Sequence, residues 1–324
     1  MVLFGHAFSI MGESPPFFLG VEVNFFGLLI FFSISGYLIS ESWVRDPSVF
    51  RYLAKRCLRI FPALTLLILL STFFLGPALS KLSPSEYFLN SQTYDYLKNI
   101  LLLYQRSLPR VFENNPLDLR VNGSLWTLLV EFFMYLLMPL LVFFKGRRNA
   151  LIFIVLIMLL FLMDSLLKSD LKESRQLVAH NFIIVSIYFL AGASVRFIFG
   201  EDAIPIAFAT SMFALNIGLY YLTNTSPYIL NALLVFTLPC FVNALGGSSR
   251  VHFLNLDRVG DLSYGIYLYA FPIQQIIAEF FIGQISVLTS IMLATIPTIC
   301  LAYVSWHLIE KKSLALKPRA VTAR

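Results

Sequence analysis

Long apolar runs recur along the chain and are separated by short polar or basic segments. About ten such runs occupy residues 2–12, 20–40, 61–79, 124–144, 150–167, 179–198, 204–223, 227–246, 262–282 and 285–306. Most are close to the roughly 20 residues that a helix needs to cross a bilayer. A transmembrane β-barrel would instead show segments of about 10 residues with alternating apolar and polar positions. The pattern therefore predicts an all-α fold, a polytopic membrane helix bundle of about ten transmembrane helices.

Composition and charge agree with lipid as the solvent. Hydrophobic residues make up 58% of the 324 residues and charged residues only 13%, and the mean hydropathy is +0.78. The net charge is +6, but the basic residues gather at the ends of the runs, which indicates membrane topology and no nucleic-acid partner. Placing the loop after the second run in the cytoplasm puts most Lys and Arg residues on that side. We therefore expect a multi-pass inner (cell) membrane protein with both termini cytoplasmic.

The organisation of the chain indicates one domain. No repeat, low-complexity tract or change of composition divides it, so we expect a single membrane-embedded domain over residues 1–324 without a soluble C-terminal domain. The longest stretch outside the runs, residues 80–123, is a candidate lid or acceptor-binding surface. Within it, the amphipathic residues 96–104 could lie in the interface or re-enter the membrane. The three cysteines are isolated, so neither disulfides nor a metal site are expected.

Ionisable residues inside apolar runs are costly and mark candidate functional positions. His6, Glu22, Glu131 and Glu279 are of this kind. His6 is the strongest candidate, because imidazole can accept and return a proton near neutral pH. The alternative is a histidine satisfied by a neighbouring helix. The run around His6 covers about half a bilayer, so either this helix is short or translation starts upstream of Met1.

A polar stripe follows one face of the fourth predicted helix. Ser124, Glu131 and Tyr135 are spaced by seven and four residues, which returns nearly to the same helical angle, and Trp126 lies on an adjacent side. Such a stripe should face the bundle interior or a wet cavity. The alternative is hydrogen bonding between helices for packing alone.

A basic row precedes the third run. Arg51, Lys55, Arg56 and Arg59 recur at helical spacing and lead into Pro62. Guanidinium groups offer planar forks of donors that suit a diphosphate. The alternative is an anchor against anionic lipid.

Small residues mark the end of the second run. Ser33, Ser35 and Gly36 permit either a close approach of helices or room for a slender ligand. No phosphate-cradling glycine loop, dinucleotide fingerprint or nucleophile elbow occurs in the sequence. Soluble nucleotide and hydrolase chemistries therefore have no support.

Six segments in chain order resemble motifs of the acyltransferase 3 family of integral membrane acyltransferases. They are Gly5-His6 and residues 27–37, 56–62, 123–135, 263–272 and 309–311. The resemblance covers nearly the whole chain. Two departures exist: the family's arginine eleven residues before the histidine falls before Met1, and Ala270 stands where the family often has histidine.

The resemblance implies O-acetylation: transfer of an acyl group, usually acetyl, from cytoplasmic acetyl-CoA to a hydroxyl of a glycan, as in polysaccharide modification. The implied partners are acyl-CoA as donor substrate, a glycan or other hydroxyl acceptor, the lipid bilayer and a partner protein for the outer-face step; no metal is implied. The implied roles are catalytic base for His6 with support from Glu131, coenzyme A binding for Arg56 and Arg59, and substrate binding for Trp126, Tyr135, Ser35 and Tyr264. The alternatives are a transporter or flippase of a lipid-linked or polymeric glycan, and an inactive member of the same fold.

Overall fold

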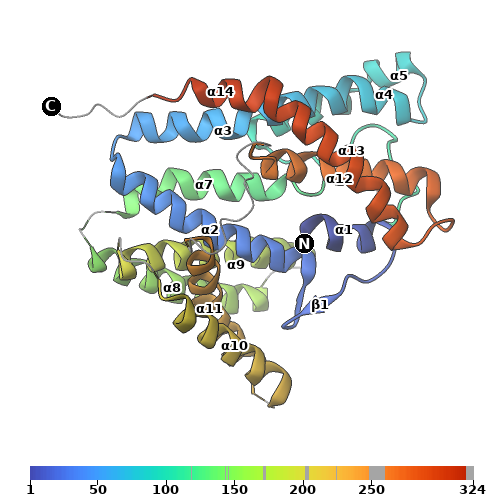
Figure 1. Ribbon diagram of the computed structural model, residues 1–324. Coiled ribbons are helices and arrows are strands. Elements are labelled where there is room, and N and C mark those ends of the chain that lie inside the picture. Colours follow the sequence, from blue (N-terminus) through green and yellow to red (C-terminus); the bar gives the residue numbers. More distant parts are fainter. Residues whose placement is uncertain are drawn as a thin grey trace. The chain divides into compact units, whose positions relative to one another are not determined.

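The computed structural model describes residues 1–117, 119–142, 144, 146–170, 173–200, 204–223, 225–247 and 260–318, without the side chains of residues 168–170, 173–175 and 227–228. Within these ranges the chain is almost entirely helical (Figure 1). The longer helices are α1 (Val2–Ile10), α2 (Val23–Arg45), α3 (Val49–Leu70), α7 (Trp126–Leu141), α8 (Arg147–Asp170), α9 (Glu173–Phe199), α10 (Ile206–Leu222), α11 (Pro227–Gly246), α12 (Ser263–Phe281) and α13 (Val287–Ser305). The short elements are β1 (Phe17–Phe18), β2 (Val21–Glu22), η1 (Ser71–Leu75), α4 (Gly76–Leu79), α5 (Pro84–Leu89), α6 (Ser91–Asp95), η2 (Tyr96–Leu101), η5 (Trp306–Glu310) and α14 (Lys311–Ala315).

Each predicted apolar run coincides with a helix, which confirms the all-α membrane bundle. In the described part of the chain, six helical stretches are long and apolar enough to cross a membrane: Val23–Arg45, Val49–Leu79, Arg147–Leu167, Gln176–Phe199, Ile229–Gly246 and Val287–Ala315. The helices α7 and α10 are apolar but shorter. The helix α1 has nine residues, and both explanations of its length stay predictions.

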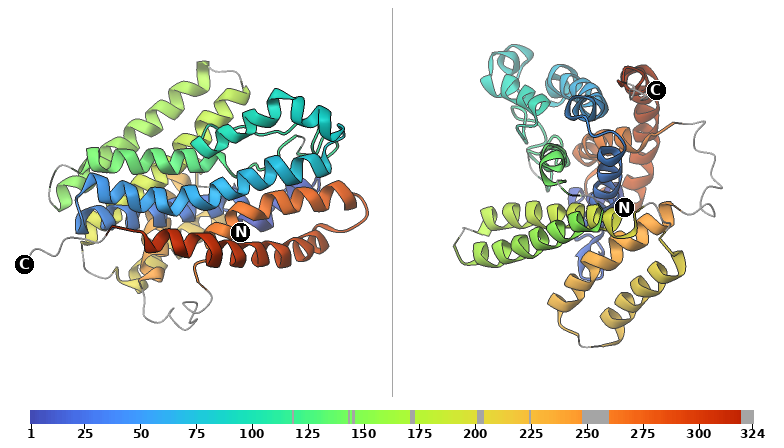
Figure 2. Two further views of the ribbon diagram at one scale, coloured as in Figure 1. Left: turned by 90° about the horizontal axis from the view of Figure 1, so that it is seen from above. Right: turned by 90° about the vertical axis from the view of Figure 1, so that its left-hand side faces the viewer.

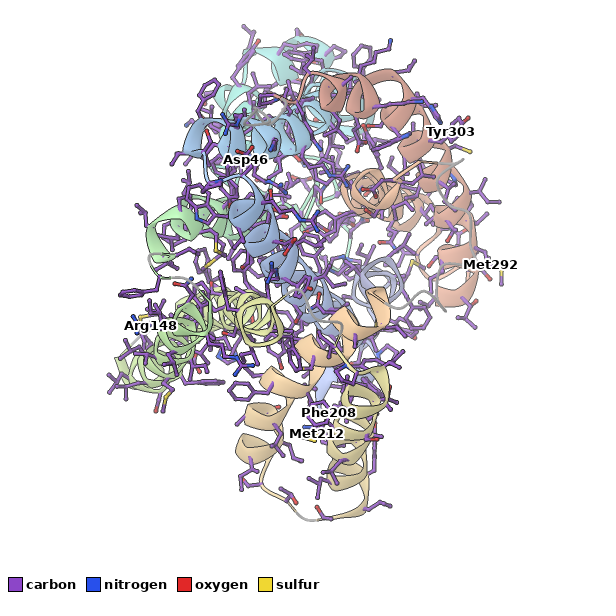
Figure 3. All side chains as sticks on the ribbon, turned by 60° about the vertical axis from the view of Figure 1, so that its left-hand side comes forward. Asp46, Arg148, Phe208, Met212, Met292 and Tyr303 are labelled. Atoms are coloured by element: carbon purple, nitrogen blue, oxygen red, sulfur yellow. The ribbon has the colours of Figure 1, made fainter. Side chains whose placement is uncertain are left out.

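The two faces of α13 show what surrounds the protein. One face carries small buried residues, including Ala294 and Ala302, and packs against α12, where a Cβ on Gly265 would lie 2.8 Å from the Cα of Ala302. The opposite face carries exposed apolar side chains, and Met292 and Ile296 are each 70% exposed. Figure 3 shows Met292 projecting from this outer face, and Figure 2 shows α12 and α13 side by side. An exposed apolar stripe opposite a small-residue seam is typical of a helix that packs on one side and meets lipid on the other.

The basic row and the third predicted span form one continuous helix. α3 begins at Val49 and passes through Pro62 without a break, because membrane helices tolerate proline where neighbouring groups satisfy the freed backbone. Beyond α3 the chain continues as the π-helix η1 and then α4. In this region the hydroxyl of Tyr87 donates a hydrogen bond of 2.8 Å to the carbonyl of Thr72. A side chain from the following segment thereby compensates for the irregular helical ladder.

The prediction that Glu22 lies inside the second helix is wrong. Glu22 belongs to the hairpin of β1 and β2, in which Phe17 pairs with Glu22. Leu19 and Gly20 form the turn with φ angles of 52° and 76°, as expected for a tight hairpin turn. α2 starts only at Val23, so the carboxylate precedes the helix.

The chain divides into two compact units. Unit 1 comprises residues Met1–Phe25, Leu53–Leu129 and Leu256–Arg324, and unit 2 comprises Phe26–Tyr52 and Val130–Asn255. The divisions fall within α2, α3 and α7. In unit 1, α1, α12 and α13 pack together; in unit 2, α8 packs on α9 and α10 on α11. The predicted single domain stays a prediction.

Candidate active site

The predicted site residues are distributed over both units. His6, Arg56, Arg59, Trp126 and Tyr264 belong to unit 1, whereas Ser35, Glu131 and Tyr135 belong to unit 2. Each group is described within its own unit. The predicted contact between His6 and Glu131 joins residues of different units and stays a prediction.

The helix that carries His6 is held by side chains of α12. The imidazole ring lies edge-to-face against the ring of Phe271, with centroids 5.2 Å apart and planes at 80°. One turn further along α12, the amide Nε2 of Gln274 donates a hydrogen bond of 2.7 Å to the carbonyl of Leu3. Leu3 lies one turn before His6 on α1. A contact on the ring and a hydrogen bond to the backbone thus fix both the position and the tilt of this short helix.

The residue before His6 lets α1 lie against the start of α2. A Cβ on Gly5 would lie 2.6 Å from the backbone nitrogen of Asn24, so only glycine permits this approach. Among the residues that the structure describes, none forms a hydrogen bond to a ring nitrogen of His6. The described structure therefore gives no support to the alternative of a histidine satisfied by a neighbouring helix. Phe271 contacts the ring, and no described residue is hydrogen-bonded to either ring nitrogen.

Trp126 is the first residue of α7 and is half-buried. The turn that leads into α7 is also held by α12, because the hydroxyl of Tyr267 donates a hydrogen bond of 2.5 Å to the carbonyl of Ser124. A Cβ on Gly123 would lie 2.6 Å from the ring of Phe271. The same aromatic ring therefore contacts His6 on α1 and the turn before Trp126. Glycine at position 123 is required by this contact.

Two neighbouring glutamines of α12 form hydrogen bonds to other segments of unit 1, which sequence reasoning missed. Gln274 holds α1, and the fully buried Gln275 holds the segment before α7. The Nε2 of Gln275 donates to the carbonyls of Leu117 at 3.0 Å and Arg120 at 2.7 Å, while Asn115 Nδ2 donates to the Gln275 Oε1 at 2.8 Å. The available signal was the pair of amides inside an apolar run, since a polar side chain at that depth needs partners.

The middle of α3 brings Arg59 to two carboxylates. Its Nη2 lies 2.6 Å from the Oδ2 of Asp261, and its Nη1 lies 3.7 Å from the Oε2 of Glu310. The guanidinium also stacks over the ring of Tyr264 at 5.4 Å. The Tyr264 hydroxyl donates a hydrogen bond of 2.8 Å to the carbonyl of Ile60, the next residue on α3. The structure thus places Tyr264 with Arg59.

The other members of the basic row differ in their surroundings. Arg51, which belongs to unit 2, binds Asp46 through three N–O distances of 2.6 to 3.1 Å. In unit 1, Lys317 lies within electrostatic range of Lys55, Arg56 and Arg59. Burial and these three cations lower the pKa of Lys317, and Asp261 acts in the opposite direction. Sequence reasoning did not include Lys317, Asp261 or Glu310 in this cluster.

In unit 2, three predicted residues form one buried polar cluster. The hydroxyl of Tyr135 donates a hydrogen bond to the carboxylate of Glu131, one turn earlier on α7. The Oγ of Ser35 on α2 lies 3.4 Å from the same hydroxyl. All three side chains are buried. Glu131 and Tyr135 of the predicted stripe therefore meet, and Ser35 joins them from another helix. Ser124, the third predicted member, precedes the first residue of α7, so its predicted place on this helix is wrong.

The small residues of α2 serve a close approach of helices. A Cβ on Gly36 would lie 2.7 Å from the carbonyl carbon of Phe189 on α9, and a Cβ on Gly192 would lie 2.8 Å from the carbonyl carbon of Ser33. The backbones of α2 and α9 are therefore in direct contact. In the part of the chain that the structure describes, no group of three or more His, Cys, Asp or Glu side chains is placed to hold a metal ion.

Comparison with known proteins identifies the family of the chain. The family model for the acyltransferase domain of the acyltransferase 3 family matches residues 1–307. The chain is 31% identical, over 97% of its length and 92% of the relative's, to a protein named O-acetyl transferase from Shigella phage Sf6. It is 26% identical, over its whole length and 92% of the relative's, to Nodulation protein 10 of Rhizobium leguminosarum bv. viciae. No solved structure shows a significant match. The chain therefore belongs to the acyltransferase 3 family and is a membrane O-acyltransferase.

Proposed function

We propose that this protein transfers an acetyl group from acetyl-CoA to a hydroxyl of a glycan, with His6 as the catalytic base. The observation that carries the proposal is the state of His6. Its ring is fixed by Phe271, whereas neither ring nitrogen has a hydrogen-bond partner among the described residues. A general base requires a positioned nitrogen that is free to accept the substrate's proton.

The chemistry follows from one proton acceptor. A nitrogen of His6 takes the proton of the acceptor hydroxyl. The hydroxyl oxygen attacks the thioester carbonyl carbon and forms the new ester bond. The carbon–sulfur bond breaks, and the coenzyme A thiolate takes the proton back from the imidazolium. An apolar bundle supports this reaction because excluding water limits hydrolysis of the thioester.

The donor is proposed to enter at the basic end of α3, on the cytoplasmic side of the inner membrane. Arg56 and Arg59 would bind the phosphates of coenzyme A, and Lys317 adds a further cation to the same cluster. Arg59 presents a planar fork that suits a phosphate, and stacking on Tyr264 holds that fork in place. The adenine and pantetheine parts of the donor have no assigned partners here.

The acceptor is proposed to be a surface or extracellular glycan, bound with the help of Trp126. The relative from phage Sf6 is named an O-acetyl transferase, which supports acetyl as the acyl group. Glu131, Tyr135 and Ser35 form a ready-made buried polar cluster, and we propose that it supports the catalytic base. A partner protein would serve the outer-face step where one is needed.

The test is acetyl transfer by the purified protein in lipid nanodiscs, with acetyl-CoA and extracted surface glycan, read by mass spectrometry. His6→Ala should lower kcat by about 10²- to 10⁴-fold, the usual contribution of a general base. His180→Ala removes a histidine of α9 that lies outside the proposed machinery and should retain wild-type activity per folded molecule. Retained activity in His6→Ala would refute the base. Glycan export without acetylation by the wild type would favour the transporter.

A further inference from the structure

Arg59 lies between two carboxylates that differ in exposure. The side chain of Asp261 is 52% exposed, whereas that of Glu310 is 2% exposed and that of Arg59 is 24% exposed. Glu310 is also fixed by the hydroxyl of Ser305, which donates to its Oε1 at 2.9 Å. Glu310 is therefore the inner carboxylate, and Asp261 is the outer, more exposed one.

Asp261 is supported by the start of α12 and needs no charge for that role. Its Oδ1 accepts hydrogen bonds from the Oγ of Ser263 at 2.5 Å and from the backbone N–H of Ser263 at 3.3 Å. Its other oxygen, Oδ2, contacts Arg59 at 2.6 Å. Asparagine keeps an Oδ1 that can accept both hydrogen bonds from Ser263, but it has no charge to pair with Arg59. The contact with Ser263 and the ion pair of Asp261 can thus be separated by a single substitution.

Further cations lie within electrostatic range of this ion pair. Lys55, Arg56 and Arg59 each act on Lys317, and Asp261 and Glu310 are carboxylates that the described structure places against Arg59. Releasing Asp261 from Arg59 would raise the attraction of this cluster for an anion. Two oxygens of a phosphate can accept the same pair of parallel hydrogen bonds from a guanidinium that a carboxylate accepts. A phosphate can therefore replace the outer carboxylate on the same edge.

We propose that Asp261 is a displaceable internal counter-ion that occupies Arg59 in the absence of donor, gives way to a phosphate of acyl-CoA, and so sets donor affinity. This inference rests on the proposed use of acyl-CoA as donor. In this proposal the ion pair with Asp261 opposes binding of the donor, whereas Glu310 stays beside Arg59 in both states. Because Asp261 faces solvent, its carboxylate can turn into water when the phosphate arrives.

The test compares Asp261→Asn with the wild type in nanodiscs, first by calorimetric titration of free coenzyme A. Exposed ion pairs contribute about 0.2–1 kcal/mol, so removing this competitor should tighten coenzyme A binding by up to about fivefold. Ser263→Ala is the matched control, because it removes the hydroxyl that donates to Asp261 Oδ1 and keeps the ion pair with Arg59. Its affinity for coenzyme A should equal that of the wild type. Unchanged or weaker binding by Asp261→Asn, with an unchanged melting temperature, overturns the proposal.

Transfer kinetics separate this inference from the proposed function. In Asp261→Asn the KM for acetyl-CoA should fall by the same factor with kcat retained, while the KM for S-acetylpantetheine, which has no phosphate, should not change. An equal change for both donors overturns the counter-ion, since the effect would then not involve phosphate. A wild-type protein that binds coenzyme A but transfers no acetyl group would contradict the proposed function and leave the binding test decisive. No coenzyme A binding by either protein would overturn both.

Discussion

The contact between α2 and α9 makes a sharp prediction about glycine. Alanine at Gly36 or Gly192 would place a Cβ 2.7 or 2.8 Å from a backbone carbonyl carbon of the facing helix, with the carbonyl oxygen closer still. Reaching an ordinary contact of 3.4 Å with the carbonyl carbon alone requires a separation of about 0.7 Å at Gly36 and about 0.6 Å at Gly192, and the nearer oxygen requires more. Backbone cannot rotate away as a side chain can. Overpacking of this kind costs about 1–3 kcal/mol, so both variants should unfold at lower temperature.

The matched control is Gly218→Ala. Gly218 lies within α10, and a Cβ there would meet no atom within 4 Å. Alanine is favoured over glycine within a helix by about 0.5–1 kcal/mol, so this variant should be neutral or more stable than the wild type. Replacing glycine by alanine is thus expected to lower stability at Gly36 and Gly192 but not at Gly218.

Thermal unfolding in detergent, followed by the loss of the monodisperse peak in size-exclusion chromatography, measures the difference. The double variant of Gly36 and Gly192 should cost less than the sum of the single variants, because one helix separation relieves both clashes and contacting sites are not additive. Single variants with the stability of Gly218→Ala would refute the direct backbone contact of α2 and α9.

Three further predictions concern individual side chains. Tyr135→Phe removes the donor to Glu131; leaving a buried carboxylate without this bond should cost about 1–3 kcal/mol of stability, measured by the same unfolding assay. Phe271→Leu removes the ring that positions the α1 histidine, and because misplacement of about 1 Å costs up to about 10²-fold, kcat should fall with little change in KM. The Ser83 hydroxyl and N–H lower the pKa of Glu86, so the capping of α5 should persist above the ordinary pKa of glutamate and be lost as the pH falls through the lowered value. Hydrogen exchange of α5 should show this loss, and Glu86→Gln should abolish its pH dependence.

The sequence predicts the helices well because each apolar run is a local signal. It predicts a basic helix running into Pro62 and a span from residue 61, and the structure joins the two in one helix, α3. The reason is that proline breaks helices in water but is tolerated where neighbouring groups satisfy the backbone. It also places Glu22 in a helix, because a short hairpin before α2 has no signal beyond Leu19-Gly20.

In the candidate site, contacts between residues close in the sequence could be predicted, whereas contacts between distant residues could not. Helical periodicity alone predicts that Glu131 and Tyr135 meet, since they are four residues apart. The pairing of Arg59 with Asp261 joins residues 202 positions apart, and one sequence has no signal for it. The same holds for Phe271 beside His6. These contacts depend on which helices become neighbours, and hydrophobic pattern specifies burial without specifying neighbours.

The surroundings of the basic row bear on its two open interpretations. A lipid anchor contributes through charges exposed at the membrane surface, about 1 kcal/mol for each. Arg59 is partly buried, stacks on Tyr264 and contacts Asp261 and Glu310, so its position is fixed by the protein. An anchor is also superfluous in a chain with several helices long enough to span the bilayer. A guanidinium with a fixed position suits a site in which its hydrogen-bond donors bind one particular anion. The proposed recognition of a phosphate accounts for this fixed position, whereas attachment to a membrane surface does not require it.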